Sequence, residues 1–101
     1  MAASIPQEMR VIELEHYHED ITNAVVSLRV TQKPTPQPGP GQVLVRIEAA
    51  PCNPSDLVFM QGIYGVKKTL PAVPGWEGAG TVVASGGGMM GKWLNGKRVA
   101  C

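Results

Sequence analysis

Hydrophobic and polar positions alternate most clearly over residues 43–49, which read Val-Leu-Val-Arg-Ile-Glu-Ala. The first, third, fifth and seventh of these are apolar, and this period of two is typical of a half-buried strand. Weaker alternation at 9–15, a Val- and Leu-rich run at 24–30, and the runs 75–85 and 97–101 predict further strands. Gly78 and Gly80 lie inside one of them, which indicates a bend or a close approach of two backbones.

One short helix is predicted from Pro54. Asn53 is a strong N-cap residue, proline suits the first helical position, and Asp56 falls in the positively polarised first turn. Gly62 is a natural stop after Gln61. A helix of about two turns is stable only when it packs on a larger body.

Two other segments are predicted to be a loop and a connector. His16 and His18 lie in a polar run, 16–20, where a solvated loop is favoured over a metal site because no second ligand cluster lies nearby. Prolines occupy every second position from 34 to 40. They could form a ligand for an SH3-type domain, but the spacing favours a stiff extended connector.

Residues 86–91 match the Gly-x-Gly-x-x-Gly dinucleotide fingerprint. We reject a phosphate site because the Asn-Gly turn at 95–96 leaves no room for the required helix and no acidic residue follows. A flexible loop is expected instead. Short strands, one helix and many Gly/Pro turns together predict a small, mostly antiparallel barrel.

Composition limits the number of domains, the partners and the cellular location that can be expected. The 101 residues form one domain at most, and a formal net charge of +1 predicts neither a nucleic-acid partner nor an anionic membrane. No apolar run approaches a membrane span and residues 1–10 do not resemble a targeting signal, so a cytoplasmic location is expected. Cys52 and Cys101 are interpreted as reduced, partly buried thiols.

The runs 53–56 (Asn-Pro-Ser-Asp), 61–64 (Gln-Gly-Ile-Tyr) and 74–78 (Pro-Gly-Trp-Glu-Gly) fall in an order and spacing that resemble the medium-chain dehydrogenase/reductase superfamily. The likeness, from about Met9 to Cys101, is greatest to its zinc-free quinone oxidoreductases and mitochondrial enoyl thioester reductases. It implies a mainly β, GroES-like fold, a partly open antiparallel barrel with one or two short helices.

On this resemblance, residues 1–101 are the N-terminal part of the catalytic domain of a two-domain NADPH-dependent reductase. The Rossmann domain, which binds most of the cofactor, is absent from the chain, so this piece alone is expected to be inactive. The full-length enzyme is expected to be a homodimer that reduces quinones, enones or enoyl thioesters. The alternative is a non-catalytic GroES-like binding or structural module.

The resemblance also suggests the site. Zinc-dependent members carry a Cys at the position of Asn53 and a His at the position of Trp76, so no catalytic zinc is expected here. Cys52 is one position off. Glu77, which keeps its place in the motif, is interpreted as a structural carboxylate.

Tyr64 matches the tyrosine of the enoyl thioester reductases, which implies a catalytic hydrogen-bond donor to the substrate carbonyl; the alternative is a packing aromatic. Asn53 matches a residue beside the nicotinamide and substrate, a role compatible with helix capping. Trp76 is a candidate for the substrate pocket or a buried barrel residue. Lys67 and Lys68 could meet a phosphate or an acyl carrier, although a solvated turn is favoured.

Overall fold

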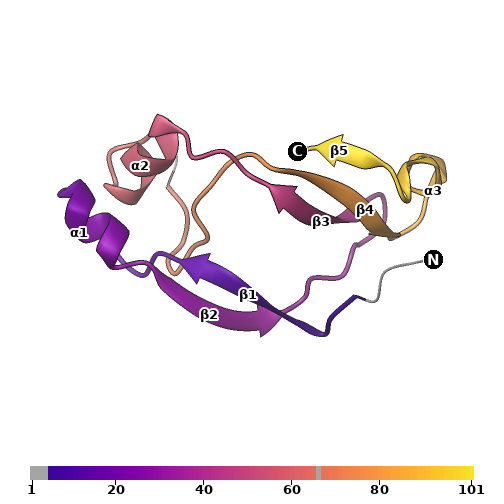
Figure 1. The fold of residues 1–101 in the computed structure, drawn as a ribbon, viewed down its shortest axis with the longest axis horizontal. Helices are drawn as coiled ribbons and strands as arrows, with labels where there is room; N and C mark the ends of the chain where they lie inside the picture. Colours follow the sequence, from indigo (N-terminus) through magenta and orange to yellow (C-terminus); the bar gives the residue numbers. More distant parts are fainter. Residues whose placement is uncertain (1–4, 66) are drawn as a thin grey trace. The chain divides into compact units, whose positions relative to one another are not determined.

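The computed structural model describes residues 5–65 and 67–101, and within them the chain forms five strands and three short helices (Figure 1). In chain order these are β1 (Glu8–Glu13), α1 (Ile21–Val26), β2 (Arg29–Pro34), β3 (Val43–Ala49), α2 (Pro54–Met60), β4 (Ala79–Ser85), α3 (Met89–Leu94) and β5 (Arg98–Ala100). They divide into two compact units. The helix unit comprises Glu8–Lys33 and Cys52–Trp76, and the sheet unit comprises 5–7, Pro34–Pro51 and Glu77–Cys101.

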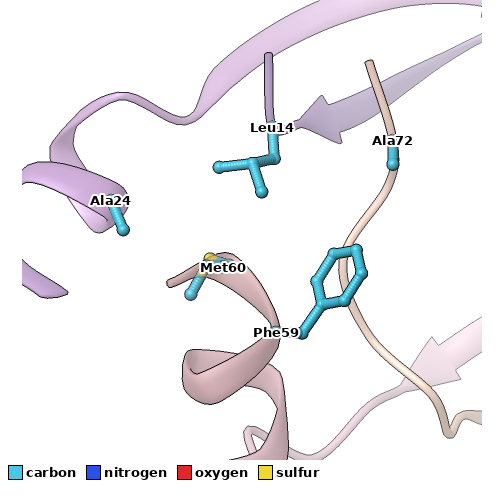
Figure 2. Packing of buried hydrophobic residues seen from close by; sticks show 5 residues of the cluster. All are labelled: Leu14, Ala24, Phe59, Met60 and Ala72. Atoms are coloured by element: carbon cyan, nitrogen blue, oxygen red, sulfur yellow. The ribbon is translucent and has the colours of Figure 1, made fainter. Parts of the chain in front are cut away.

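The core of the helix unit gathers side chains from both of its segments. Figure 2 shows its five buried members, which are Leu14, Ala24, Phe59, Met60 and Ala72. Leu14 follows β1 and exchanges two backbone hydrogen bonds with Ala72, of 2.8 and 3.0 Å. This bridge joins residues 58 positions apart, so the core forms only when both segments of the unit come together.

Helix α2 starts and stops as the sequence predicts. Asn53 is the N-cap and forms a capping box with Asp56, whose Oδ2 accepts a hydrogen bond from the Asn53 backbone N–H at 2.9 Å. Pro54 is the first helical residue, and Gly62 follows the C-cap with φ +77°. Phe59 and Met60 lie in the core, which provides the packing that a seven-residue helix needs.

Helix α1 replaces part of a predicted strand. We expected a strand over 24–30, but residues 21–26 are helical and β2 begins only at Arg29. The side chain of Asp20 caps the helix by accepting hydrogen bonds from the backbone N–H groups of Thr22 and Asn23, at 2.8 and 3.3 Å. The expectation was wrong because the cap and the burial of Ala24 in the core outweigh the strand propensity of Val25 and Val26.

Strands β1 and β2 form a two-stranded sheet and run in opposite directions (Figure 1). A buried carboxylate lies between them. Glu13 is 5% exposed, pairs with Lys33 Nζ at 2.6 Å and accepts a hydrogen bond from Thr31 Oγ1 at 2.6 Å. Chiefly the hydrogen bond from Lys33, and then that from Thr31, hold the pKa of Glu13 below its ordinary value.

The sheet unit contains an antiparallel sheet in the order β3-β4-β5. Gly80 pairs with Ile47 of β3 on one side and with Val99 of β5 on the other. A Cβ atom at position 80 would lie 3.0 Å from Ile47 Cα and 2.8 Å from the carbonyl carbon of Arg46, and closer still to its oxygen. The close backbone approach expected from the glycines is therefore found at Gly80.

Strand β3 departs from a simple alternation. The register with β4 shifts between Leu44 and Val45 and again between Ile47 and Ala49. Such bulges change which face a side chain occupies, and Ile47 is 53% exposed although the pattern assigns it to the apolar face.

Helix α3 corrects the expectation of a loop after residue 86. Asn95 is its C-cap and Gly96 has φ +82°, so the Asn-Gly pair ends a helix that had already formed. Gly86, before the helix, and Gly91, inside it, allow neighbouring atoms to come closer than a side chain would permit. A Cβ at Gly86 would lie 2.7 Å from the carbonyl oxygen of Pro38, and one at Gly91 would lie 3.3 Å from Ser85 Cβ.

The GroES-like, mainly β fold is confirmed, with two differences in detail. The strands form two sheets with no closed barrel among the described residues, and there are three short helices where one or two were expected. Each helix has six or seven residues, and within 5–65 and 67–101 none has the length and hydropathy needed to cross a bilayer.

Candidate functional site

Four of the chain's five aromatic residues form a row in the helix unit. Tyr17 meets Phe59 edge to face with ring centroids 5.6 Å apart, and Phe59 meets Trp76 in the same manner at 5.5 Å. Tyr64 lies against Trp76 at 5.7 Å with an angle of 39° between the rings. These separations are those of favourable aromatic pairs. The aromatic row thus links the core at Phe59 to the exposed loop that carries Tyr64.

An ammonium group lies over the row. Lys68 Nζ is 4.5 Å from the centroid of Trp76 and 5.5 Å from that of Phe59, and it donates a hydrogen bond to the carbonyl oxygen of Val73 at 3.2 Å. A cation within about 6 Å of an indole face is attracted by the ring quadrupole. Lys68 was expected to lie in a solvated turn, but it is half-buried and its charge is directed at the ring on which Tyr64 rests.

Tyr64 is placed where a substrate could reach it. The residue is 37% exposed, and its ring packs on that of Trp76 in a tilted arrangement. A phenol at the end of a supported ring can donate one hydrogen bond and accept others. This geometry suits a donor to a developing oxyanion and also suits a packing aromatic, so the catalytic role of Tyr64 stays a prediction.

Asn53 lies at the other end of α2 from Phe59. It is half-buried, and its backbone carbonyl accepts a hydrogen bond from the Asp56 N–H at 3.0 Å. The capping box orients the residue before the helix begins. The helix therefore connects Asn53 to the aromatic row, and a role beside a cofactor stays a prediction.

Two buried polar atoms close to this framework have no hydrogen-bond partner among the described residues. They are Trp76 Nε1, a donor, and Asp56 Oδ1, an acceptor. A buried polar group without a partner has a free-energy cost of about 1–3 kcal/mol. The indole of Trp76 is half-buried, so it is not a fully buried barrel residue, and its place in a substrate pocket stays a prediction.

No group of three His, Cys, Asp or Glu side chains gathers as a metal site within the described part of the chain. Cys52 and Cys101 are free and exposed, so the expectation that they are partly buried was wrong. His16 and His18 lie in the loop before the N-cap of α1, as the sequence predicts. Glu77 is exposed and lies in the sheet unit, whereas Tyr64, Trp76 and Asn53 all lie in the helix unit.

The sequence of the chain is similar to that of a known domain family. The model of the alcohol dehydrogenase GroES-like domain matches residues 39–101. The chain belongs to this family. Because the match includes α2, the Tyr64 loop and the sheet of the sheet unit, the GroES-like domain covers most of the described structure.

Similar proteins include two groups of relatives. The chain is 52% identical over 54 residues to the synaptic vesicle membrane protein VAT-1 homolog of Rattus norvegicus, and 53% identical over 53 residues to the mitochondrial enoyl-[acyl-carrier-protein] reductase of Bos taurus. These matches cover 54% and 52% of the chain but only 13% and 14% of the relatives.

A solved structure extends the likeness over nearly the whole chain. It is a provisionally assigned NADPH:quinone reductase from Mesorhizobium loti, with a TM-score of 0.78 and 36% identity over 97% of this chain and 30% of its own. The predicted resemblance to the N-terminal domain of quinone and enoyl reductases is thereby confirmed. The chain spans less than a third of that protein's length.

Sequence reasoning missed two contacts of the site. Lys68 was considered only, together with Lys67, as a contact for a phosphate or an acyl carrier or as part of a solvated turn, and Tyr17 only as part of the polar run 16–20. Tyr17 Oη hydrogen-bonds to the backbone of Lys68, 51 residues further along the chain. No local pattern signals a contact over that separation.

Proposed function

We propose that the GroES-like domain of this chain is the substrate-binding part of an NAD(P)H-dependent oxidoreductase that reduces quinones, enones or enoyl thioesters. The observation that carries the proposal is the exposed Tyr64, supported on Trp76 in a segment that resembles the enoyl thioester reductases, one of which is 53% identical to the chain over 53 residues. The preference for NADPH over NADH follows the solved relative assigned as an NADPH:quinone reductase.

The chemistry requires a donor at the substrate oxygen. A bound reduced nicotinamide would supply hydride to the far carbon of a conjugated carbonyl, and the electron pair of the double bond would then rest on the substrate oxygen as an enolate. A positioned hydrogen-bond donor lowers the energy of that charge, and a proton must then reach the adjacent carbon. The Tyr64 hydroxyl donates to the enolate oxygen and assists the protonation.

Asn53 and Trp76 complete the proposed substrate side. The amide of Asn53 carries both donor and acceptor atoms, which suits a carboxamide such as that of nicotinamide. Trp76 supports Tyr64 and provides an apolar wall. An amide and an indole do not form the donor set of an open zinc site, so the residues at these positions do not fit a catalytic zinc and none is assigned a step.

Replacing Tyr64 with phenylalanine tests the proposal in the full-length protein. Tyr64→Phe keeps the ring contact with Trp76 and removes only the hydroxyl. We expect kcat to fall by about 10² or more, the lower end of what a positioned acid contributes, equivalent to about 3 kcal/mol of barrier. The loss should be larger for an enoyl thioester than for a quinone, which needs less proton assistance.

The affinity for NADPH and the midpoint of thermal unfolding should not change, since neither depends on the hydroxyl. Rates with both substrates and the NADPH dissociation constant are the measurements. A variant with near wild-type kcat for both substrates would reduce Tyr64 to a packing residue. If the wild-type protein also reduced neither substrate, the non-catalytic module would become the better description.

A further inference from the structure

We propose that Tyr17 is a positioning residue that holds the Tyr64 loop at both ends; the proposal rests on the function proposed above. Tyr17 lies between β1 and α1, far from Tyr64 in sequence, and is half-buried. Its contacts fall on Gly62, two residues before Tyr64, and on Lys68, four residues after it.

At the first end, the contact is steric. A Cβ atom at Gly62 would lie 2.9 Å from Tyr17 Cβ, so the backbone after α2 passes directly against the tyrosine. The residues after Tyr17 also bind to the C-terminal end of α2. The His18 N–H donates to Met60 O at 3.1 Å, and Gln61 Nε2 donates to Glu19 O at 2.8 Å. The polar loop at 17–19 therefore runs along the end of α2.

At the second end, the phenol of Tyr17 makes two hydrogen bonds with one residue. Tyr17 Oη donates to the carbonyl oxygen of Lys68 at 2.9 Å and accepts from the Lys68 N–H at 3.0 Å. One hydroxyl thus satisfies both backbone polar groups of Lys68 and fixes its main chain. The only hydroxyl proton is therefore donated to the backbone and is not available to a substrate, so Tyr17 acts through structure.

The side chain of Lys68 connects this anchor to Tyr64. With its main chain fixed, Lys68 places Nζ 4.5 Å from the centroid of the Trp76 ring. Tyr64 rests on the same ring at 5.7 Å. The order of contacts is Tyr17 to Lys68, Lys68 to Trp76, and Trp76 to Tyr64, and the position of the Tyr64 phenol depends on each of them.

Tyr17→Phe isolates the hydroxyl. It keeps the ring that meets Phe59 at 5.6 Å and lies under Lys67 Nζ at 5.7 Å, and it removes both hydrogen bonds to Lys68. In the full-length protein we expect kcat to fall about tenfold with the KM for NADPH unchanged. The loss is smaller than that of Tyr64→Phe, because the donor is misplaced for part of the time but still present.

Trypsin supplies a readout that does not depend on activity. Cleavage after Lys68 requires the backbone there to open, and we expect Tyr17→Phe to speed it at least about fivefold, since opening no longer breaks the two bonds. Cleavage after Lys97, in the sheet unit, serves as the internal reference and should not change. Ser27→Ala is the matched control, since it also removes a hydroxyl bond to a backbone carbonyl, that of Ala24 at 2.8 Å, in the same unit. It should alter neither the rate nor the cleavage.

Each outcome decides a separate point. Unchanged cleavage after Lys68 would show that Tyr17 does not hold the loop. A second contrary outcome is that Tyr17→Phe is cleaved faster after Lys68 but keeps the wild-type kcat, while Tyr64→Phe is slow. Tyr17 would then hold the loop, but the reaction would not depend on it, and the proposal would also be overturned. If Tyr64→Phe has normal activity, the proposed function fails, while the cleavage rates still report whether Tyr17 anchors Lys68.

Discussion

Gly80→Ala offers a sharp test of the sheet, because the position is enclosed by backbone and not by movable side chains. A Cβ atom there would lie 2.8 Å from the Arg46 carbonyl carbon and 3.0 Å from Ile47 Cα. Ordinary carbon contacts lie at about 3.5–4.0 Å. Strands β3 and β4 would have to separate by about 1 Å at the Ile47–Gly80 pair, which lies near one end of their shared ladder but is enclosed by β5 on its other side.

The expected cost combines two effects. Overpacking a rigid site costs about 1–3 kcal/mol, and weakening one or two ladder hydrogen bonds adds about 0.5–1.5 kcal/mol each. We therefore expect Gly80→Ala to lower the free energy of unfolding by about 2–4 kcal/mol, a large share of the 5–15 kcal/mol typical of a folded protein. Urea titration followed by far-ultraviolet circular dichroism measures the difference.

Gly65→Ala is the matched control for this experiment. It makes the same chemical change at a glycine with no atom within 4 Å of the added Cβ and no positive φ. It should be neutral or slightly stabilising, because alanine reduces the freedom of the unfolded chain. Equal unfolding midpoints for the two variants would refute the reasoning that the close approach at Gly80 is rigid.

Two further predictions concern pH and zinc. Lys33 and Thr31 lower the pKa of Glu13 in the folded state below its ordinary value of 4.5. The ionised Glu13 side chain should therefore stabilise the fold fully above pH 4.5, and this stabilisation should be lost as the pH falls through the pKa of the folded state. Glu13→Gln should therefore be less stable than wild type at pH 7 and approach it in acid unfolding titrations; a constant difference down to pH 2 would contradict this. On the function proposed above, the intact protein should keep its reductase rate after mild chelation, since Asn53 and Trp76 do not supply a zinc donor set; a stoichiometric zinc required for turnover, found by elemental analysis, would disprove this.

The elements that the sequence predicts well are those whose signals are local. Helix α2 is bounded by Asn53, Pro54 and Gly62, which act through their own backbone preferences, and it appears where they place it. The close approach at Gly80 is also predictable, because a glycine inside a strand often marks a place where a second backbone comes near. Such signals operate before any tertiary contact forms.

The elements that were missed depend on partners distant in sequence. Helix α1 contains Val25 and Val26, which favour strands, and the local cap at Asp20 outweighs them only together with the packing of Ala24 against the core. Helix α3 has glycine, Gly88, as its N-cap, so no capping side chain in the sequence indicates where the helix begins. In the site, Tyr64 and Trp76 could be named from the motif, but the contact from Tyr17 to Lys68 could not, since it joins residues 51 positions apart.

The two tryptophans give the protein a built-in pair of optical reporters. Trp76 belongs to the helix unit, half-buried between Phe59 and Tyr64, while Trp93 belongs to the sheet unit and is 64% exposed with Lys97 Nζ 4.8 Å from its ring centroid. Indole emission depends on local polarity, so the two units report at different wavelengths. A Trp93→Phe background leaves Trp76 as the only tryptophan in this chain, and its emission, excited beyond the absorption of tyrosine, then follows the ring that supports Tyr64 as a proposed substrate or cofactor is added.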